Sequence, residues 1–67
     1  MNHAKLRGKI AESGFTQAQI AADLGISANT MTKKMNNRAE FNLSEVIKLC
    51  EILSISEATE KAEIFLQ

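Results

Sequence analysis

The sequence predicts an all-α fold in a single domain covering residues 1–67, and three observations lead to this prediction. The chain contains no proline, and no apolar–polar alternation of the kind typical of strands is sustained. Apolar residues instead recur at helical spacing. Gly14 and Gly25 stand where helices would end in the left-handed conformation. Together these features predict a small bundle of short helices.

The helix boundaries are marked by repeated capping patterns. Thr16 and Asn42 each follow a phenylalanine and precede a helical pattern, as N-cap residues do. Gln19 and Glu45 stand three residues further on, where a capping box would close. The expected helices cover residues 2–12, 17–24, 28–36, 43–53 and 57–66. The expected core contains the apolar residues of these helices and of their capping positions: Leu6, Ile10, Phe15, Ile20, Leu24, Ile26, Met31, Met35, Phe41, Val46, Ile47, Cys50, Leu53 and Ile55.

Several classes of function lack the residues that they need. Cys50 is the only cysteine, which excludes a disulfide within one chain, and we interpret it as a small core residue. His3 is the only histidine, so neither a zinc cluster nor a catalytic pairing with histidine is expected. We expect no enzymatic activity, metal, cofactor or small-molecule substrate. No apolar run suggests a signal peptide or a membrane span, so the expected location is the cytoplasm, at the nucleoid.

The formal net charge is zero, but the two halves of the chain carry opposite charges. Residues 1–38 contain six basic and two acidic residues, a net charge of +4, whereas residues 39–67 contain two basic and six acidic residues, a net charge of −4. This asymmetry favours nucleic acid, or a basic protein, as a partner. The alternative is that these side chains are only the solvated faces of helices.

Residues 17–24 and 28–36, joined at Gly25, fit the description of a helix-turn-helix. If Met31 and Met35 face the core, the second of these helices presents a polar surface that fits the major groove of DNA. On that surface Asn29 could pair with adenine and Lys33 could donate to guanine. The outward-facing set is Ala28, Asn29, Thr32, Lys33 and Asn36, and the methyl groups of Ala28 and Thr32 could meet a thymine methyl.

The segment TQAQIAADLGISANTMTKKMNN resembles the lambda-repressor-like, Cro/repressor-type helix-turn-helix family. The segment EFNLSEVIKLCEIL resembles the fourth helix of that fold, particularly in small regulators of temperate phages of Gram-positive bacteria. The resemblance implies a compact five-helix domain that binds double-stranded DNA. Two positions depart from the family pattern: Lys34 replaces a large apolar residue, and Asn37 replaces the glycine common after the third helix.

The resemblance also implies roles for individual residues. Gln17 would bind a phosphate and Asn36 would contact the DNA backbone, while Ser27, the expected N-cap of the third helix, joins the candidate DNA-binding set. The base-reading positions would be Ala28, Asn29, Thr32 and Lys33. Alternatives remain open, because Gln17 could serve the helix cap, Asn29 could bond local backbone, and Lys33 could be a solvated lysine.

Two functions remain after this comparison. The first is a sequence-specific DNA-binding regulator of a phage-type lysis–lysogeny switch that reads the major groove with the third helix. The alternative is a protein-binding modulator of repression, which pairs with a phage repressor and alters its DNA binding. Both imply a partner protein, in a homodimer or in a heteromeric complex with a repressor.

The C-terminal helix, with exposed parts of the helix over residues 43–53, is the expected surface for self-association or for binding a partner repressor, while the third helix is left for DNA. Ala58, Ala62 and Phe65 would form a narrow apolar stripe that docks on the bundle. Ile64 or Leu66 should then remain at least partly exposed, and we expect the partner to contact Ile64, Phe65 and Leu66. The alternative is a frayed apolar terminus.

Overall fold

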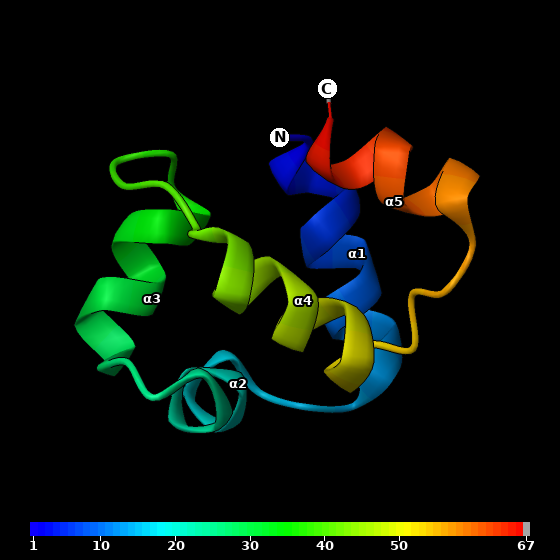
Figure 1. The fold of residues 1–67 in the computed structure, drawn as a ribbon. Helices are drawn as coiled ribbons and strands as arrows, with labels where there is room; N and C mark the ends of the chain where they lie inside the picture. The colour runs from blue at the N-terminus through cyan, green and yellow to red at the C-terminus, as the bar shows by residue number, and fades with distance from the viewer. Residues whose placement is uncertain (67) are drawn as a thin grey trace.

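The computed structural model describes residues 1–66, which form five α-helices and no strand (Figure 1). The helices are α1 (His3–Ser13), α2 (Gln17–Leu24), α3 (Ala28–Met35), α4 (Leu43–Ile52) and α5 (Ala58–Phe65). Each boundary lies within one residue of the expected one, and the all-α class is confirmed.

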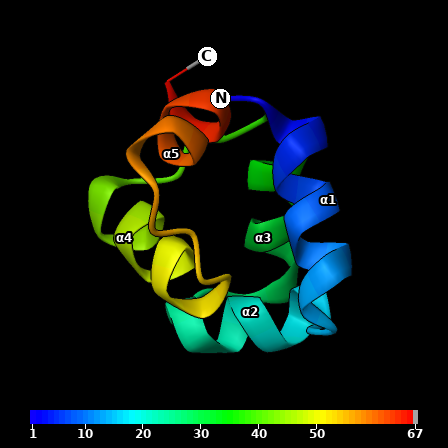
Figure 2. The same ribbon diagram turned by 90° about the vertical axis from the view of Figure 1, so that its right-hand side faces the viewer.

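The helices wrap around one core, with α3 at one end of the molecule and α5 at the other (Figure 1). α2 packs against both α3 and α4, and α1 packs against α5. Figure 2 shows α4 and α1 on opposite sides of the bundle, with α2 crossing below them. The two ends of the described chain meet, because the Asn2 N–H donates to the Ile64 carbonyl oxygen at 2.6 Å.

Both expected capping boxes are present. The Gln19 N–H donates to Thr16 Oγ1 at 3.1 Å, and the Thr16 N–H donates to Gln19 Oε1 at 2.9 Å. At α4 the Glu45 N–H donates to Asn42 Oδ1 at 2.8 Å, and the Asn42 N–H donates to Glu45 Oε1 at 2.9 Å. These reciprocal bonds satisfy backbone donors that the first turn of a helix leaves without partners. They explain why the helix starts are where the sequence places them.

The core contains most of the residues expected in it. The buried apolar residues are Leu6, Ile10, Ile20, Ala21, Leu24, Met31, Met35, Leu49, Leu53, Ile55 and Ile64. Ile26, Phe41 and Cys50 are partly buried against this core, and Val46 is half-buried.

Two residues expected in the core are exposed. Phe15 is 44% exposed, because it lies between α1 and α2, outside both helices, where only part of its ring is covered. Ile47 is 51% exposed, and Leu49 is fully buried instead. The α4 segment is apolar on nearly every side, so its spacing does not fix the inner face. Glu45 points inward and Leu49 follows it by one turn, which places Ile47 on the outer side.

α5 is held against α1 by both apolar and charged contacts. The sequence analysis expected α5 to dock through a stripe that begins at Ala58, but Ala58 is exposed. Ile64 is the residue of α5 that is buried in the core. Lys5 pairs with Glu63 at 2.9 Å, and Lys9 pairs with Glu60 at 2.8 Å. Among the described residues, no helix has the length and apolar character needed to span a membrane.

Candidate nucleic-acid interface

α3 is positioned by a tight connection from α2 and by two buried methionines. Gly25 ends α2 in the left-handed conformation at φ 76°, and its N–H donates to the Ala21 and Ala22 carbonyl oxygens. Three residues later α3 has begun, and Met31 and Met35 fasten its inner face to the core. The opposite face of α3 is therefore turned to solvent, as the sequence predicts.

The candidate DNA-binding residues lie along α3, at its two ends and at the start of α2, and all seven are exposed: Gln17, Ser27, Ala28, Asn29, Thr32, Lys33 and Asn36. Gln17 is the first residue of α2, whose capping box is formed by Thr16 and Gln19. The side chains of Gln17, Asn29 and Lys33 hydrogen-bond to no residue between 1 and 66. Their polar groups remain available to a ligand.

Three other candidates already make hydrogen bonds within the protein. Ser27 caps α3, because its Oγ accepts from the Thr30 N–H at 3.1 Å and donates to Thr30 Oγ1 at 2.9 Å. Thr32 Oγ1 donates to the Ala28 carbonyl oxygen at 3.0 Å, which leaves its methyl group and its lone pairs free. Asn36 Oδ1 accepts a hydrogen bond from Arg7. The two N–H groups of the Asn36 side-chain amide remain available to donate to a ligand.

Arg7 connects α1 to the end of α3. Its Nη2 donates to the Met35 carbonyl oxygen at 3.0 Å and to Asn36 Oδ1 at 2.9 Å. A cation at the C-terminus of a helix also interacts favourably with the helix dipole. Arg7 thus fixes the C-terminal turn of α3 and adds positive charge beside it. Its role was missed in the sequence, where only its charge was noted, because the contact joins residues far apart in the chain.

α3 ends in a left-handed residue that is not glycine. Asn37 has φ 60°, the conformation expected for the glycine that it replaces. The Arg38 N–H donates to the Lys33 carbonyl oxygen at 2.8 Å, and the Asn37 N–H donates to the Lys34 carbonyl oxygen at 3.3 Å. This closure places Arg38 three residues after the end of α3, where it is exposed. The arginine is a second functional candidate that the sequence analysis did not select.

Ion pairing concentrates the free positive charge at α3. Of the six basic residues in the first half of the chain, Lys5, Lys9 and Lys34 pair with carboxylates. The hydrogen bond with Glu60 raises the pKa of Lys9. Within the described part of the chain, Lys33 and Arg38 have no carboxylate partner. The acidic residues of α5 therefore neutralise α1, while the cations at α3 remain unbalanced.

The family comparison agrees with this geometry. A model of the Cro/C1-type helix-turn-helix DNA-binding domain matches residues 5–59, which include the whole of α2, α3 and α4. The chain belongs to this family. Searches of curated proteins and of solved structures give no significant match. In this Cro/C1-type domain, α2 and α3 are the two helices of the motif, and the expected DNA-binding character is confirmed at the level of the family.

The expected partner-binding set at the C-terminus needs correction in this Cro/C1-type domain. Ile64 is 1% exposed and belongs to the core, so it is not accessible to a partner protein. Phe65 is half-buried against the core, and Leu66 is 82% exposed. The expectation that one of Ile64 and Leu66 stays exposed is confirmed by Leu66. Of the three residues, only Leu66 projects fully into solvent.

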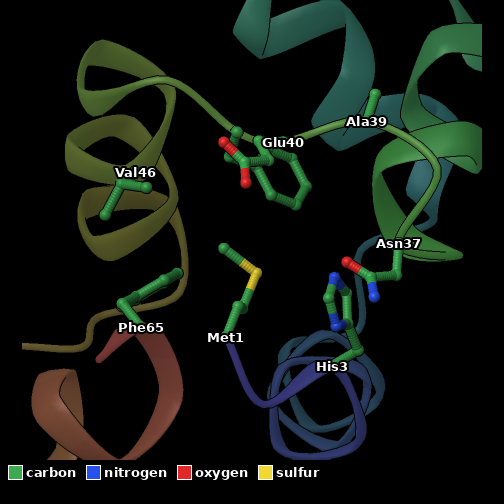
Figure 3. Close-up of a pocket in the computed structure, with 8 residues that line it drawn as sticks. Met1, His3, Asn37, Ala39, Glu40, Val46 and Phe65 are labelled. Atoms are coloured by element: carbon green, nitrogen blue, oxygen red, sulfur yellow. The ribbon is translucent and has the colours of Figure 1, made fainter. Parts of the chain in front are cut away.

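A hollow of about 230 Å³ lies between the ends of α1 and α5 and the α3–α4 connection (Figure 3). Figure 3 shows His3 and Asn37 side by side, with the Glu40 carboxylate across the hollow. Pockets for small molecules usually enclose about 300–1,000 Å³. The hollow is smaller, and its lining does not include the outward face of α3. None of the seven candidate DNA-binding residues lines it, although Asn37 and Ala39, the neighbours of Arg38, do.

Proposed function

We propose that the protein is a sequence-specific transcriptional regulator whose α3 enters the major groove of double-stranded DNA. The supporting observation is the pair Asn29 and Lys33. They lie one turn apart on the exposed face of α3, and neither side chain has a hydrogen-bond partner among residues 1–66. An amide and an ammonium group that the fold leaves unused are the groups that read adenine and guanine edges.

The neighbouring residues supply complementary contacts. Ala28 and the Thr32 methyl group are suited to apolar contact with thymine methyl groups. Gln17, at the start of α2, and Arg38, three residues after the end of α3, flank the reading surface and are suited to phosphates. This arrangement divides the contacts into a short base-reading segment and a phosphate-binding border.

The charge distribution supports the same orientation on DNA. α3 and α5 lie at opposite ends of the molecule (Figure 1), and the carboxylates of α5 face the lysines of α1. Phosphates approaching α3 therefore meet Lys33 on a helix that lies away from the acidic α5, with Arg38 in the connection that follows it. Repulsion by the acidic half disfavours the opposite orientation.

The test is selection of duplexes from a random pool, followed by fluorescence anisotropy with the enriched sequence at several salt concentrations. Lys33→Gln is compared with Lys5→Gln, which removes the same charge from a half-exposed surface pair on α1. We expect Lys33→Gln to weaken binding strongly and Lys5→Gln to leave it nearly unchanged. Failure to enrich any sequence, or equal effects of the two variants, would contradict the proposal.

A second candidate is the protein-binding modulator, which pairs with a DNA-binding repressor and changes its operator choice. The observation that favours it is the apolar exposure of α4, where Leu43 is 76% and Ile47 51% exposed. The finer assignment of either function to a phage lysis–lysogeny switch is supported by the sequence resemblance. Gel shifts of the promoters beside its gene separate the two, using this protein, the neighbouring repressor, and both together. A shift that appears or disappears only in the mixture indicates the modulator.

A further inference from the structure

The C-terminal half of α3 is joined to the neighbouring helices by a small number of directional contacts. Among the described helices, α2 packs most closely against α3. Met35 buries one side of this half in the core, and its carbonyl oxygen accepts a hydrogen bond from Arg7 of α1. On the other flank Lys34 donates to Glu45 of α4. The core contact determines which side of α3 faces inward, and the two polar contacts limit how far this half can rotate about its axis.

The acceptor of the Lys34 ammonium is itself held in place by the start of α4. Glu45 is buried, and its Oε1 also accepts the Asn42 N–H at 2.9 Å. The Glu45 N–H in turn donates to Asn42 Oδ1 at 2.8 Å, so the carboxylate belongs to the capping box of α4. The ring of Phe41 lies 5.7 Å from the same ammonium. A charge-assisted hydrogen bond to a fixed carboxylate constrains both distance and direction, which an apolar contact does not.

The backbone of Lys34 also carries part of the closure that ends α3. The Asn37 N–H donates to the Lys34 carbonyl oxygen at 3.3 Å, and the Arg38 N–H donates to the Lys33 carbonyl oxygen at 2.8 Å. A rotation of the C-terminal half of α3 would therefore turn the exposed Lys33 and displace Arg38 with it. Asn29 lies in the first turn, beside the tight connection from α2, and would move less.

We propose that Lys34 is a positioning residue for DNA recognition. Its ion pair with Glu45 fixes the rotation of the C-terminal half of α3, so that Lys33 is presented to the bases and Arg38 to the phosphates. Lys34 acts through these neighbours, because its own ammonium is engaged inside the domain. The inference deepens the proposed function and rests on it for what Lys33 and Arg38 contact. The constraint on the helix is a property of the free protein and is measured without DNA.

The first test measures the end of α3 in the free protein. Lys34→Met/Glu45→Gln, called the ion-pair variant, removes the pair without leaving an unpaired buried charge. Hydrogen exchange followed by NMR compares the Arg38 amide, in the closure of α3, with the Gly25 amide in the corresponding ending of α2. In the ion-pair variant the rate for Arg38 relative to Gly25 should rise about tenfold or more, because the end of α3 opens locally. A general loss of stability raises both rates, so Ile64→Ala, a change at α5, should leave their ratio unchanged.

The second test compares single base pairs of the selected duplex. Lys33→Ala and Asn29→Ala each identify the base pair at which they relax the preference. The ion-pair variant should relax the preference at the Lys33 base pair by about tenfold, the order of one base contact, and leave the preference at the Asn29 base pair intact. A loss of stability lowers only the binding-competent fraction and weakens binding to all duplexes equally, which Ile64→Ala should show.

Circular dichroism checks that the variants keep the helical fold. Lys34→Leu/Glu45→Gln removes the same ion pair with a side chain of different shape, and it replaces the ion-pair variant in both tests if that variant does not fold.

The outcomes distinguish this inference from the proposed function. An unchanged exchange ratio, or a preference lost equally at both base pairs, overturns the positioning role of Lys34. A faster Arg38 amide with both base preferences intact overturns it as well, since the constraint would then have no bearing on recognition. Failure to select any duplex contradicts the proposed function instead. The exchange ratio needs no DNA, so it then still decides whether the ion pair holds the end of α3.

Discussion

Lys34 and Glu45 form an ion pair that joins α3 to α4 inside the domain. Their side chains are only 11% and 9% exposed, and Lys34 Nζ donates to Glu45 Oε1. The same carboxylate accepts the Asn42 N–H of the capping box, and the Lys34 ammonium lies 5.7 Å from the centre of the Phe41 ring. The lysine that departs from the resembled family's apolar pattern is therefore an internal link between α3 and α4.

The first prediction concerns the charge of Glu45. Burial favours the neutral acid and acts to raise the pKa of Glu45, but the hydrogen bonds from Lys34 and from the Asn42 N–H outweigh it and lower the pKa. The stabilisation is then present above the unfolded-state pKa of about 4.3 and is lost as the pH falls through the lower folded-state value. We expect Glu45→Gln to reduce the free energy of unfolding at neutral pH by about 3 kcal/mol, because it leaves Lys34 unpaired. Urea denaturation of both proteins at pH 7 and at acidic pH measures the difference, which should shrink in acid.

The matched control removes both charges. In Lys34→Met/Glu45→Gln neither side chain is left as an unpaired buried charge, so stability at neutral pH should recover most of the loss. The amide of glutamine can still accept the Asn42 N–H. A loss from Glu45→Gln no larger than that from breaking the exposed Lys5–Glu63 pair would show that the internal pair does not stabilise the domain.

The second prediction separates base contacts from phosphate contacts. Asn29→Ala and Lys33→Ala should each weaken binding to the selected duplex by about 1–3 kcal/mol and relax the preference at one base pair. Gln17→Ala should weaken binding to all sequences alike, because phosphates carry no sequence information. Anisotropy titrations with the selected duplex and its single-base variants measure both effects. Uniform losses for all three variants would show that α3 lies along the backbone without reading bases.

The third prediction concerns Arg38, which lies three residues after the end of α3 and has no carboxylate partner in the described residues. Each phosphate that a protein neutralises adds about 0.9 to the steepness of log K against log salt. Arg38→Gln should therefore reduce this slope by about one for each protomer bound and leave the base preference unchanged. Anisotropy titrations at several salt concentrations measure the slope, and an unchanged value would place Arg38 outside the interface.

The sequence predicted local features of the structure better than long-range ones. The helix starts were predictable because Thr16 and Asn42 and their capping partners are three residues apart. The inner face of α4 was not, because the run around Ile47 is apolar on nearly all sides and its orientation depends on the contact between Lys34 and Glu45. In the candidate site, the exposure of Asn29 and Lys33 was predictable from helical spacing once Met31 and Met35 were assigned to the core.

The contribution of Arg7 was beyond local pattern reasoning for the same reason. Its bonds to Met35 and Asn36 form only when α1 packs beside the end of α3. The burial of Ile64 likewise depends on the docking of α5 on α1, which no local spacing specifies. Contacts between distant segments thus decided the burial of Ile64 and the position of Arg7.

The fourth prediction compares two left-handed residues that are not glycine. Asn37 (φ 60°) follows α3 and Ser54 (φ 56°) follows α4, in the same kind of helix ending. Asparagine tolerates this conformation better than most residues other than glycine. Ser54→Gly should therefore stabilise the domain by up to about 1 kcal/mol, and Asn37→Gly by less. Thermal unfolding monitored by circular dichroism ranks the two, and a reversed order would contradict the explanation.

The last prediction concerns two residues near the C-terminus. Ile64 is 1% exposed and Leu66 is 82% exposed, although only one residue separates them. Ile64→Ala should lower the free energy of unfolding by about 2–5 kcal/mol, since it leaves a cavity between α5 and α1. Leu66→Ala should change it by no more than about 0.5 kcal/mol. Urea denaturation of the two variants makes the comparison. Truncation after Ala62 should destabilise the domain at least as much as Ile64→Ala, because it removes the same buried side chain together with Phe65 and the partner of Lys5. Equal stability of all these proteins would show that α5 is not part of the folded core.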